Sequence, residues 1–207
     1  MPTMTSTLIP AHFSIATERL HISCLEPGNL SHSTFLHHLW NTDEFIEAEG
    51  NTGLDTQEKI GEFITNKVQS NYKKNGYGQM LVSLKPHPGA SLAESKPIGI
   101  VSLMKGDGEN AYTAPDVGYT ILPQENRKGY ATEAATGLIA YAKRELGVEG
   151  VFGFCAQNDK RSRRVLEKIG MEFRGKRHLK YFGGAHSAVY ALPGMEDLKD
   201  YGIEDDV

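Results

Sequence analysis

Cysteine is scarce in this sequence: its 207 residues include two, Cys24 and Cys155. Two cysteines are too few for a disulfide framework or for a zinc site built on cysteine ligands, and they favour a reducing, intracellular setting. No apolar run approaches the roughly 18 residues that indicate a membrane-spanning helix. The first residues also lack the charged-then-apolar layout of a signal peptide. We therefore expect neither secretion nor a membrane partner.

Excess positive charge and a nucleotide-binding phosphate loop are also missing. The formal net charge is −4, which disfavours non-specific binding of nucleic acid through a basic surface. The pattern Gly-x-x-x-x-Gly-Lys-Ser/Thr does not occur, which argues against a P-loop nucleotide-binding protein. The neighbouring histidines His32, His37 and His38 have no carboxylate and histidine partners at helical spacing, so no metal site is predicted.

Length and composition favour one globular domain flanked by two short ends. Hydrophobic residues make up 39% of the chain and charged residues 23%, values typical of soluble globular proteins. Residues 1–16 are rich in Thr, Pro and Ser and are predicted to form a flexible surface segment. Residues 17–194 form the predicted domain. Residues 195–207 hold six acidic residues and one lysine, and we expect a solvated tail or a contact for a partner.

Apolar periodicity predicts a mixed α/β (α+β) chain with about seven strands and about four helices. The predicted strands cover residues 17–25, 79–84, 98–104, 117–122, 151–156, 172–176 and 188–192. The predicted helices cover residues 29–40, 55–74, 131–142 and 160–169, the second opening on a capping box at Asp55 and Glu58. The connection 85–97 is long for a compact domain and is expected to be lid-like or disordered. The loop between the last two strands is expected to hold His178, Lys180, Tyr181 and His186.

The stretch from Pro115 to Ala134 organises the chain. A β-rich run over residues 117–122 ends at Pro123, and from Ala131 onward apolar residues recur at helical spacing. The first N–H groups of such a helix lack partners and lie at the positive end of the helix dipole, so phosphate is their natural occupant. A plain surface connection with solvated basic residues would show the same local pattern. The residues of the predicted anion site are Asn126, Arg127, Lys128, Gly129, Tyr130, Ala131 and Thr132.

Individual residues of this connection suit an anionic ligand. Gly129 has no Cβ, so a ligand can approach the backbone closely and φ can be positive. Arg127 and Lys128 add positive charge, and the Thr132 hydroxyl can donate to a phosphate oxygen. Residues 124–180 contain 13 Lys and Arg against 7 Asp and Glu. That surplus suits a polyanionic small ligand, although a solvated basic face gives the same count.

A second strand–helix unit follows. The near-continuous apolar run 151–156 predicts a strand buried on both faces, and the helix 160–169 ends before Gly170. Ser162 falls on the apolar face of that helix, one turn after Asn158. A hydroxyl in this position needs a partner, which is either its own i−4 carbonyl or a bound ligand.

The first of these units resembles a motif of a known superfamily. Asn126-x-x-Gly129-x-Ala131 resembles the Gln/Arg-x-x-Gly-x-Gly/Ala pyrophosphate-binding motif of the GNAT acyl-CoA N-acyltransferases, with Asn126 as a departure from it. The longer run 127–134 resembles the version in the ribosomal-protein alanine acetyltransferase (RimJ/RimL-like) branch. The Thr-Glu-Arg-Leu run at residues 17–20 is similar to the opening strand of the same branch.

The second unit resembles the other signature of this superfamily. The run Asn158-x-x-x-Ser162, continued by Glu-Lys-x-Gly170-Met171, is similar to Asn-x-x-Ser-x-x-x-x-Glu-Lys-x-Gly-Phe. Met171 stands where phenylalanine is usual, a replacement that apolar packing tolerates. The resemblance covers residues 116–173 well and the remainder of the chain in outline.

The resemblance implies a GNAT fold, a mixed and mostly antiparallel twisted sheet flanked by helices. It implies that a bulge in the strand 117–122 splays it from the strand 151–156, and that the pantetheine arm of acetyl-CoA, the co-substrate, enters the gap. Ser162 is the implied proton donor to the leaving sulfur. Asp116, where this branch often has Glu, is the implied base, unless it is simply a turn residue after Pro115. The implied cofactor-binding residues are Tyr119, Ile121, Asn126, Arg127, Lys128, Gly129, Tyr130, Ala131, Thr132, Asn158 and Ser162.

The implied activity is that of a cytoplasmic, metal-free N-acetyltransferase. Its acceptor is a protein N-terminal α-amine or a small-molecule amine, selected by residues between Trp40 and Tyr72. An α-amine, with a pKa of about 8, needs less help from a base than a lysine amine at about 10.4. The alternatives are a different acyl donor, such as succinyl-CoA, and a CoA-binding regulatory or scaffold module without turnover. The choice between monomer and homodimer stays open.

Overall fold

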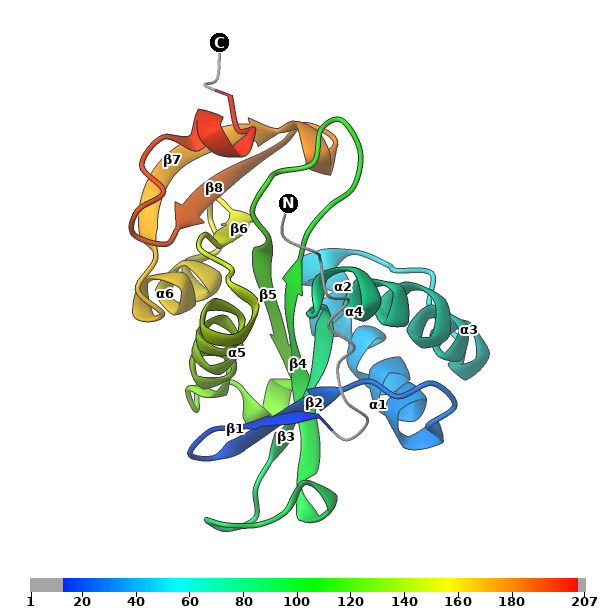
Figure 1. Cartoon of the computed structure of the whole chain (residues 1–207). Coiled ribbons are helices and arrows are strands. Elements are labelled where there is room, and N and C mark those ends of the chain that lie inside the picture. The colour runs from blue at the N-terminus through cyan, green and yellow to red at the C-terminus, as the bar shows by residue number, and fades with distance from the viewer. Residues whose placement is uncertain (1–12, 205–207) are drawn as a thin grey trace.

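The fold is built on one sheet of eight strands in the order β1-β2-β3-β4-β5-β6-β8-β7 (Figure 1). It is described here from a computed structural model, which covers residues 13–204. The strands are β1 (Ser14–Ala16), β2 (Leu20–Cys24), β3 (Gln79–Leu84), β4 (Lys96–Met104), β5 (Asp116–Ile121), β6 (Phe152–Ala156), β7 (Glu172–Leu179) and β8 (Ala185–Ala191). Neighbouring strands are antiparallel except β5 and β6, which are parallel. The predicted mixed sheet is confirmed, with β1 in addition to the seven predicted strands.

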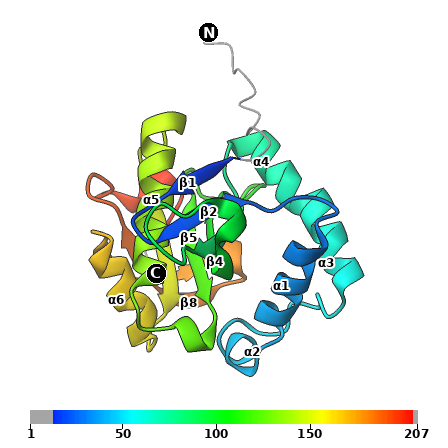
Figure 2. The same ribbon diagram turned by 90° about the horizontal axis from the view of Figure 1, so that it is seen from below.

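Helices cover both faces of the sheet, with α5 and α6 on one face and α1 to α4 on the other (Figures 1 and 2). They are α1 (Leu30–Trp40), α2 (Asp43–Glu49), α3 (Gln57–Phe63), α4 (Gln69–Asn75), α5 (Tyr130–Leu146) and α6 (Lys160–Lys168). A π-helical turn, Ile64–Val68, joins α3 to α4. The apolar pattern does not predict α2, because none of its residues is fully buried. Within residues 13–204 no helix combines the length and the apolar character needed to cross a bilayer.

The start of α3 differs from the prediction. Thr56, rather than Asp55, is the N-cap, and its hydroxyl accepts a hydrogen bond of 3.2 Å from the N–H of Lys59. The Asp55 carboxylate instead pairs with Lys59 Nζ at 2.7 Å. Thr56 takes the role because its backbone is extended immediately before the first helical residue, as an N-cap requires.

Small side chains let α5 pack closely against the sheet. Its buried residues are Ala134, Ala135, Leu138, Ile139 and Ala142, the face that the periodicity predicts. A Cβ added at Gly137 would lie 2.8 Å from Thr17 Cγ2, so a glycine is needed where the helix passes the turn before β2. This close packing holds the middle of α5 against the N-terminal strands.

Both ends of the domain extend beyond the predicted limits. Residues 14–16, predicted to be flexible, form β1 and pair with residues 21–23 of β2. Met195, Leu198 and Ile203 are buried in the core, so the tail expected to be solvated packs against the domain instead. The acidic residues between these three apolar side chains conceal the pattern. Residues 1–12 and 205–207 of the two predicted end segments lie outside the described residues.

The long connection between β3 and β4 is neither lid-like nor disordered. Ala90 is buried, and its carbonyl oxygen lies 2.9 Å from His21 Nε2 on β2. Ser91 and Glu94 form a capping box on a short 3₁₀ helix, Leu92–Glu94. These contacts hold the connection against the sheet.

The β7–β8 hairpin is longer than predicted. His178 and His186 are partners across the two strands, and their rings stack with centroids 4.3 Å apart. Lys180 and Tyr181 do lie in the connecting turn. The apolar pattern misses this extension because, among residues 177–179 and 185–187, only Leu179 is buried.

The central strands separate after a single rung. β5 and β6 pair at Asp116 and Phe152, where the Phe152 N–H donates to the Pro115 carbonyl at 2.8 Å. Beyond this point β6 continues with β8, and β5 continues with β4. Each residue of β5 has one partner on β4, so the splay arises without the expected bulge in β5. The two strands diverge because each follows the twist of its own antiparallel neighbour.

Candidate functional site

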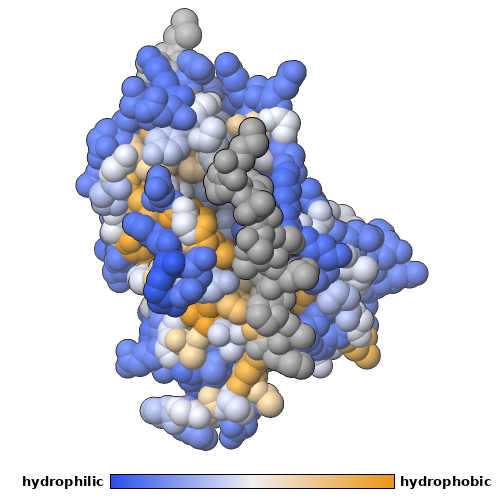
Figure 3. All heavy atoms as spheres, viewed as in Figure 1, coloured by the Kyte–Doolittle hydropathy of each residue, from blue (hydrophilic) through white to orange (hydrophobic). Residues whose placement is uncertain are grey.

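Two helices begin where the central strands diverge. α5 follows β5 and α6 follows β6 in the chain. Because β5 and β6 are parallel, both helices start beyond the carboxyl ends of the strands, on the open side of the splay. Their first N–H groups have no intrahelical partners. Figure 3 shows hydrophobic surface gathered beside α5 in the middle of the molecule, with hydrophilic surface around it.

The connection before α5 has the backbone of an anion-binding loop. Gly129 is the N-cap of α5 with φ of 84°, and Arg127 has φ of 66°, unique among the described residues other than glycine. The Glu133 N–H donates to the Gly129 carbonyl at 3.0 Å, which leaves the N–H groups of residues 130–132 ahead of the helical ladder. Residues 126–129 are exposed. Backbone turned in this way presents N–H groups to an anion.

The positive charge of Lys128 is paired with a carboxylate just before the loop. Its Nζ pairs with the Glu125 carboxylate at 2.8 Å, and the hydrogen bond to Glu125 raises the pKa of Lys128. A further cation beside the loop, Arg19, comes from far away in the sequence. Arg19 Nη1 donates to the Lys128 carbonyl at 2.9 Å, and the guanidinium lies 4.7 Å from the centroid of the Tyr130 ring.

Glu133, in the first turn of α5, fastens this arginine to the helix. Its carboxylate accepts hydrogen bonds from Arg19 Nε at 2.7 Å, from the Arg19 N–H at 2.8 Å and from the Thr17 hydroxyl at 2.6 Å. Burial opposes ionisation of Glu133, but these hydrogen bonds outweigh it and lower the pKa. The contacts span 114 to 116 residues, which is why sequence reasoning missed Arg19 and Glu133 as site residues.

Asp116 lies at the last rung before the splay. Alternation along β5 places its side chain on the same face as Gly118 and Thr120. Burial raises the pKa of Asp116 to about 7. None of the ion pairs among the described residues involves this carboxyl group. An unpaired carboxyl group that titrates near neutral pH can exchange a proton with a reacting group.

The start of α6 faces β5 across the splay. Asp159 caps the helix by accepting from the N–H groups of Arg161 and Ser162, at 2.9 and 3.1 Å. The Tyr119 hydroxyl donates to the Ser162 carbonyl at 3.0 Å, and burial raises the pKa of Tyr119, which keeps it protonated. The sequence on either side of Ser162, residues 157–167, contains no tyrosine, because Tyr119 belongs to another element. The structure brings one there from β5.

The remaining predicted residues lie around the same gap. Ser162 is half-buried and Asn158 is exposed just before the cap of α6. The Ile121 side chain is buried in the core, so its backbone is what can face a ligand. Ala131 and Thr132 are half-buried in the first turn of α5. The structure thus brings the predicted residues to two helix starts on one side of β5, with Asp116 at the point of divergence.

A cavity of about 460 Å³ lies on the other side of β5. It is bounded by helices α1 to α3 and the strands β3 to β5. Its apolar lining consists of Trp40, Phe45, Leu54, Phe63 and Ile100. Its polar lining consists of Glu49, Thr52, Gln79, Ser102 and Thr120. The range predicted to select the substrate, residues 40–72, includes part of this lining. It omits Gln79 and Ile100, which belong to strands.

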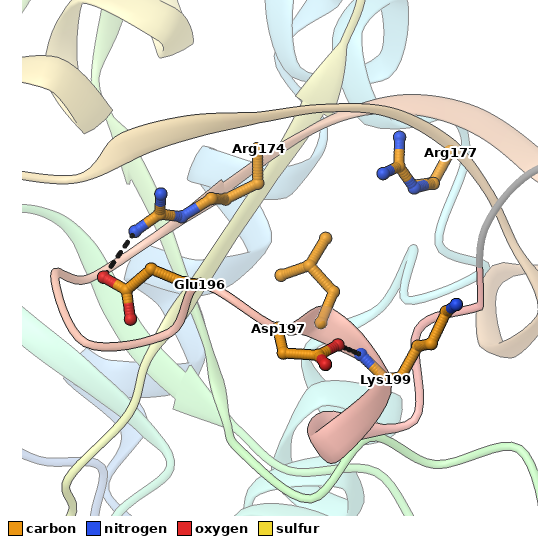
Figure 4. Close-up of a pocket in the computed structure, with 6 residues that line it drawn as sticks. Arg174, Arg177, Glu196, Asp197 and Lys199 are labelled. Carbon is orange, nitrogen blue, oxygen red and sulfur yellow. Dashed lines mark hydrogen bonds and ion pairs between the residues drawn. The ribbon is translucent and has the colours of Figure 1, made fainter.

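A second hollow, of about 380 Å³, lies beside β7 (Figure 4). Arg174 lines it and pairs with Glu172 at 2.7 Å and with Glu196 at 3.4 Å. Asp197 accepts from the Lys199 N–H at 3.0 Å. Arg174 is thus already paired with two carboxylates, and none of the predicted site residues reaches this edge of the sheet.

Comparison with known proteins gives matches along most of the chain. A family model described as an acetyltransferase (GNAT) domain matches residues 24–172. The uncharacterized N-acetyltransferase YnaD of Bacillus subtilis (strain 168) is 33% identical over 78 residues, which are 38% of this chain and 44% of that protein. The chain therefore matches less than half the length of this relative.

Solved structures share the fold. The ribosomal-protein-S5-alanine acetyltransferase from Vibrio fischeri aligns with a TM-score of 0.67 at 18% identity, over 86% of this chain and 95% of that chain. RimL, the ribosomal L7/L12 α-N-protein acetyltransferase in complex with coenzyme A, aligns with a TM-score of 0.64 at 18% identity, over 88% and 96%. At these identities the likeness concerns the fold.

The splayed sheet with its two helix starts is thus an acetyltransferase fold. Since the family model matches most of its residues, the chain belongs to the GNAT acetyltransferase family. The resemblance of the two sequence motifs to this superfamily is confirmed.

Proposed function

We propose that this protein is an acetyl-CoA-dependent N-acetyltransferase that transfers the acetyl group directly to an amine. The observation that carries the proposal is the opening between β5 and β6, which two helix starts face. The loop backbone at Arg127 and Gly129 suits the pyrophosphate of coenzyme A, because a glycine at the helix start leaves room for the phosphates. The gap itself suits the narrow pantetheine arm, alongside the backbone of Tyr119 and Ile121.

In this proposal the loop residues hold the phosphates and the second helix start holds the arm. The N–H groups from Arg127 to Ala131, preceded by Asn126, receive the pyrophosphate, and the Thr132 hydroxyl donates to it. Asn158 and Ser162 face the pantetheine. The backbone N–H groups near Tyr119 polarise the thioester carbonyl and stabilise the oxyanion that forms on it.

The transfer requires the amine nitrogen to be neutral when it attacks the carbonyl carbon. Asp116 is the proposed base: it takes the proton of the ammonium, directly or through water, because its pKa of about 7 lies close to that of an α-amine. The C–N bond forms, the nitrogen gives up its second proton to water, and the tetrahedral intermediate expels the sulfur as the C–S bond breaks. A proton donor at the first turn of α6 completes the formation of free coenzyme A.

Ser162 is the proposed donor, and we expect Ser162→Ala to lower kcat about tenfold with little change in the KM for acetyl-CoA. The expected effect is modest because a thiol with a pKa of about 8.5 can leave as the thiolate, without help from a proton donor. Thiol release under saturating acetyl-CoA measures it. Tyr119→Phe is the matched variant, because the Tyr119 hydroxyl meets the same turn. An unchanged kcat in Ser162→Ala with a reduced kcat in Tyr119→Phe would assign the role to the tyrosine.

Arg19→Gln is expected to weaken acetyl-CoA binding about tenfold, or about 1.4 kcal/mol, and to leave kcat nearly unchanged. The substitution removes the hydrogen bonds to the Lys128 carbonyl and to Glu133 that hold the phosphate loop on the turn before β2. Calorimetric titration measures the affinity. Arg144→Gln is the control, since this exposed arginine in the last turn of α5 pairs with the adjacent Glu145. Equal affinity in wild type and Arg19→Gln would show that the loop does not depend on Arg19.

The acceptor proposed here is a protein N-terminal α-amine or a small-molecule amine. A carboxylate whose conjugate acid has a pKa of about 7 is well matched to an α-amine, and it deprotonates a more basic alkylamine, such as a lysine amine or an arylalkylamine, more slowly. The cavity beside β5 provides the acceptor side of the site.

Titration of acetyl-CoA followed by thiol release with a panel of amines tests the proposal. We expect micromolar binding and amine-dependent release of coenzyme A. Binding without release for any amine would favour a regulatory or scaffold module, and a preference for succinyl-CoA would change the donor. No binding of either thioester would refute the proposed function.

A further inference from the structure

The apolar walls of the cavity beside β5 offer aromatic rings to a ligand. Trp40 meets Phe63 edge to face with ring centroids 5.6 Å apart, and Phe45 lies 6.5 Å from Trp40. Leu54 and Ile100 complete the apolar lining. A volume of about 460 Å³ holds a compact side chain or a small aromatic amine rather than a folded surface. Aromatic faces also attract cations through the negative charge of their π-systems.

The polar lining of the cavity consists of hydrogen-bond acceptors and hydroxyl groups. Gln79 Oε1 is buried and has no hydrogen-bond partner among the described residues. The Glu49 carboxylate stands at the rim, and Ser102 and Thr120 add hydroxyl groups. None of the described residues that line the cavity is a lysine, an arginine or a histidine. A ligand that donates hydrogen bonds satisfies this lining, whereas a ligand carboxylate would meet no cation.

The helix at the rim strengthens the negative charge. α2 has four acidic residues among its seven, Asp43, Glu44, Glu47 and Glu49, and no basic residue. Partial burial raises the pKa of Glu49, and the nearby Asp159 carboxylate raises it further. A bound cation would oppose this rise in pKa, and a bound anion would add to it.

The cavity lies directly against the reacting strand. Gly118, Tyr119 and Thr120 of β5 line it, and Asp116 belongs to the same face as Gly118 and Thr120 by alternation. An amine seated in the cavity therefore has the proposed base and the proposed thioester position on one strand beside it.

We infer that the acceptor is a cationic amine with a compact apolar or aromatic body and with no carboxylate beside the amine. Peptide N-termini and arylalkylamines meet this description, and free α-amino acids do not. The inference rests on the proposed function and narrows its acceptor, because the cavity supplies aromatic rings, the Gln79 oxygen and the Glu49 carboxylate without any counter-charge for an anion.

Two pairs of acceptors test it: phenethylamine with phenylalanine, and tryptamine with tryptophan. Each pair differs by one carboxylate. The member without the carboxylate has the more basic amine, so a smaller fraction of it is neutral at a given pH. This difference in basicity works against the expected result. We expect kcat/KM, measured by thiol release at saturating acetyl-CoA, to be at least tenfold higher for the amine without the carboxylate. A ratio of one or below in both pairs would overturn the inference.

Substitutions that change the charge at position 49 test whether the Glu49 carboxylate causes this preference. Glu49→Gln is expected to raise the KM for phenethylamine severalfold and to lower the ratio of kcat/KM for phenethylamine to kcat/KM for phenylalanine. Glu49→Lys is expected to make phenylalanine the better acceptor. Glu58→Gln, in the first turn of α3 and outside both α2 and the cavity lining, is the control and should leave the ratio within twofold of wild type. A ratio unaffected by Glu49→Lys would remove Glu49 from acceptor selection. Absence of thiol release with all four compounds, in a protein that binds acetyl-CoA, would instead refute the proposed catalysis and with it this inference.

Discussion

Gly129→Trp is expected to abolish the binding of acetyl-CoA. The residue starts α5 with φ of 84°, where L-residues are strained, and its surface faces the proposed phosphates. An added Cβ would already lie 3.4 Å from Arg19 Nη2, and an indole has to extend over the exposed N–H groups. We expect affinity to fall at least 100-fold, beyond the range of a calorimetric titration that gives micromolar binding for the wild type.

The other end of the same helix provides the control for this variant. Gly147 ends α5 with φ of 67°, and an added Cβ there would meet nothing within 4 Å. Gly147→Trp therefore introduces the same kind of backbone strain without covering the loop. Comparable losses of thermal stability in the two variants, with acetyl-CoA binding lost in Gly129→Trp alone, would support the phosphate site. Retained binding in a folded Gly129→Trp protein would contradict it.

Asp116→Asn is expected to lower kcat/KM by about 10²- to 10⁴-fold, the usual contribution of a general base. The base works in its deprotonated form, so with a pKa of about 7 the wild-type rate rises as pH increases through about 7. An α-amine acceptor enters this mechanism as its ammonium, so the rate falls again above about pH 8, as the free amine loses its proton. The variant has no base and depends on amine that is already neutral, so its residual rate should rise through about pH 8 instead. An unchanged profile in Asp116→Asn would remove this residue from the mechanism.

The same carboxyl group links folding to pH. Its pKa is raised from 3.8 to about 7 in the folded protein, so between these values the folded state binds more protons than the unfolded state. The free energy of unfolding contributed by Asp116 therefore falls as pH rises through this interval. Urea unfolding at pH 5 and pH 8 should show a smaller loss for Asp116→Asn than for the wild type, which separates a buried carboxyl group from one that titrates normally.

Local sequence was enough to predict the centre of this molecule. The strand 117–122, the glycine turn at Gly129 and the apolar face of the following helix lie within about twenty residues, and each obeys short-range rules. The splay of β5 from β6 and the two helix starts follow from the resemblance of the two motifs. The roles assigned to Asp116, Ser162 and the loop residues stay predictions that the variants above test.

Contacts between distant parts of the chain could not be predicted in this way. Arg19 reaches the loop before α5 over more than 100 residues, and Tyr119 reaches Ser162 across the splay. α2 has no fully buried residue and therefore no apolar stripe, although Glu49 at its end lines the cavity. The expected bulge in β5 was wrong, because the divergence comes from the partners that β5 and β6 each keep.

The single rung between Asp116 and Phe152 divides the sheet into two leaves, β1 to β5 and β6 with β8 and β7. Along the open edges beyond it, β5 and β6 offer each other no continuing ladder. A thin ligand that pairs with both edges would therefore act as a missing strand and turn two leaves into one hydrogen-bonded sheet. Protection of amide hydrogens from exchange would then rise on both leaves together when the ligand binds. The co-substrate would thus serve as part of the architecture for as long as it is bound.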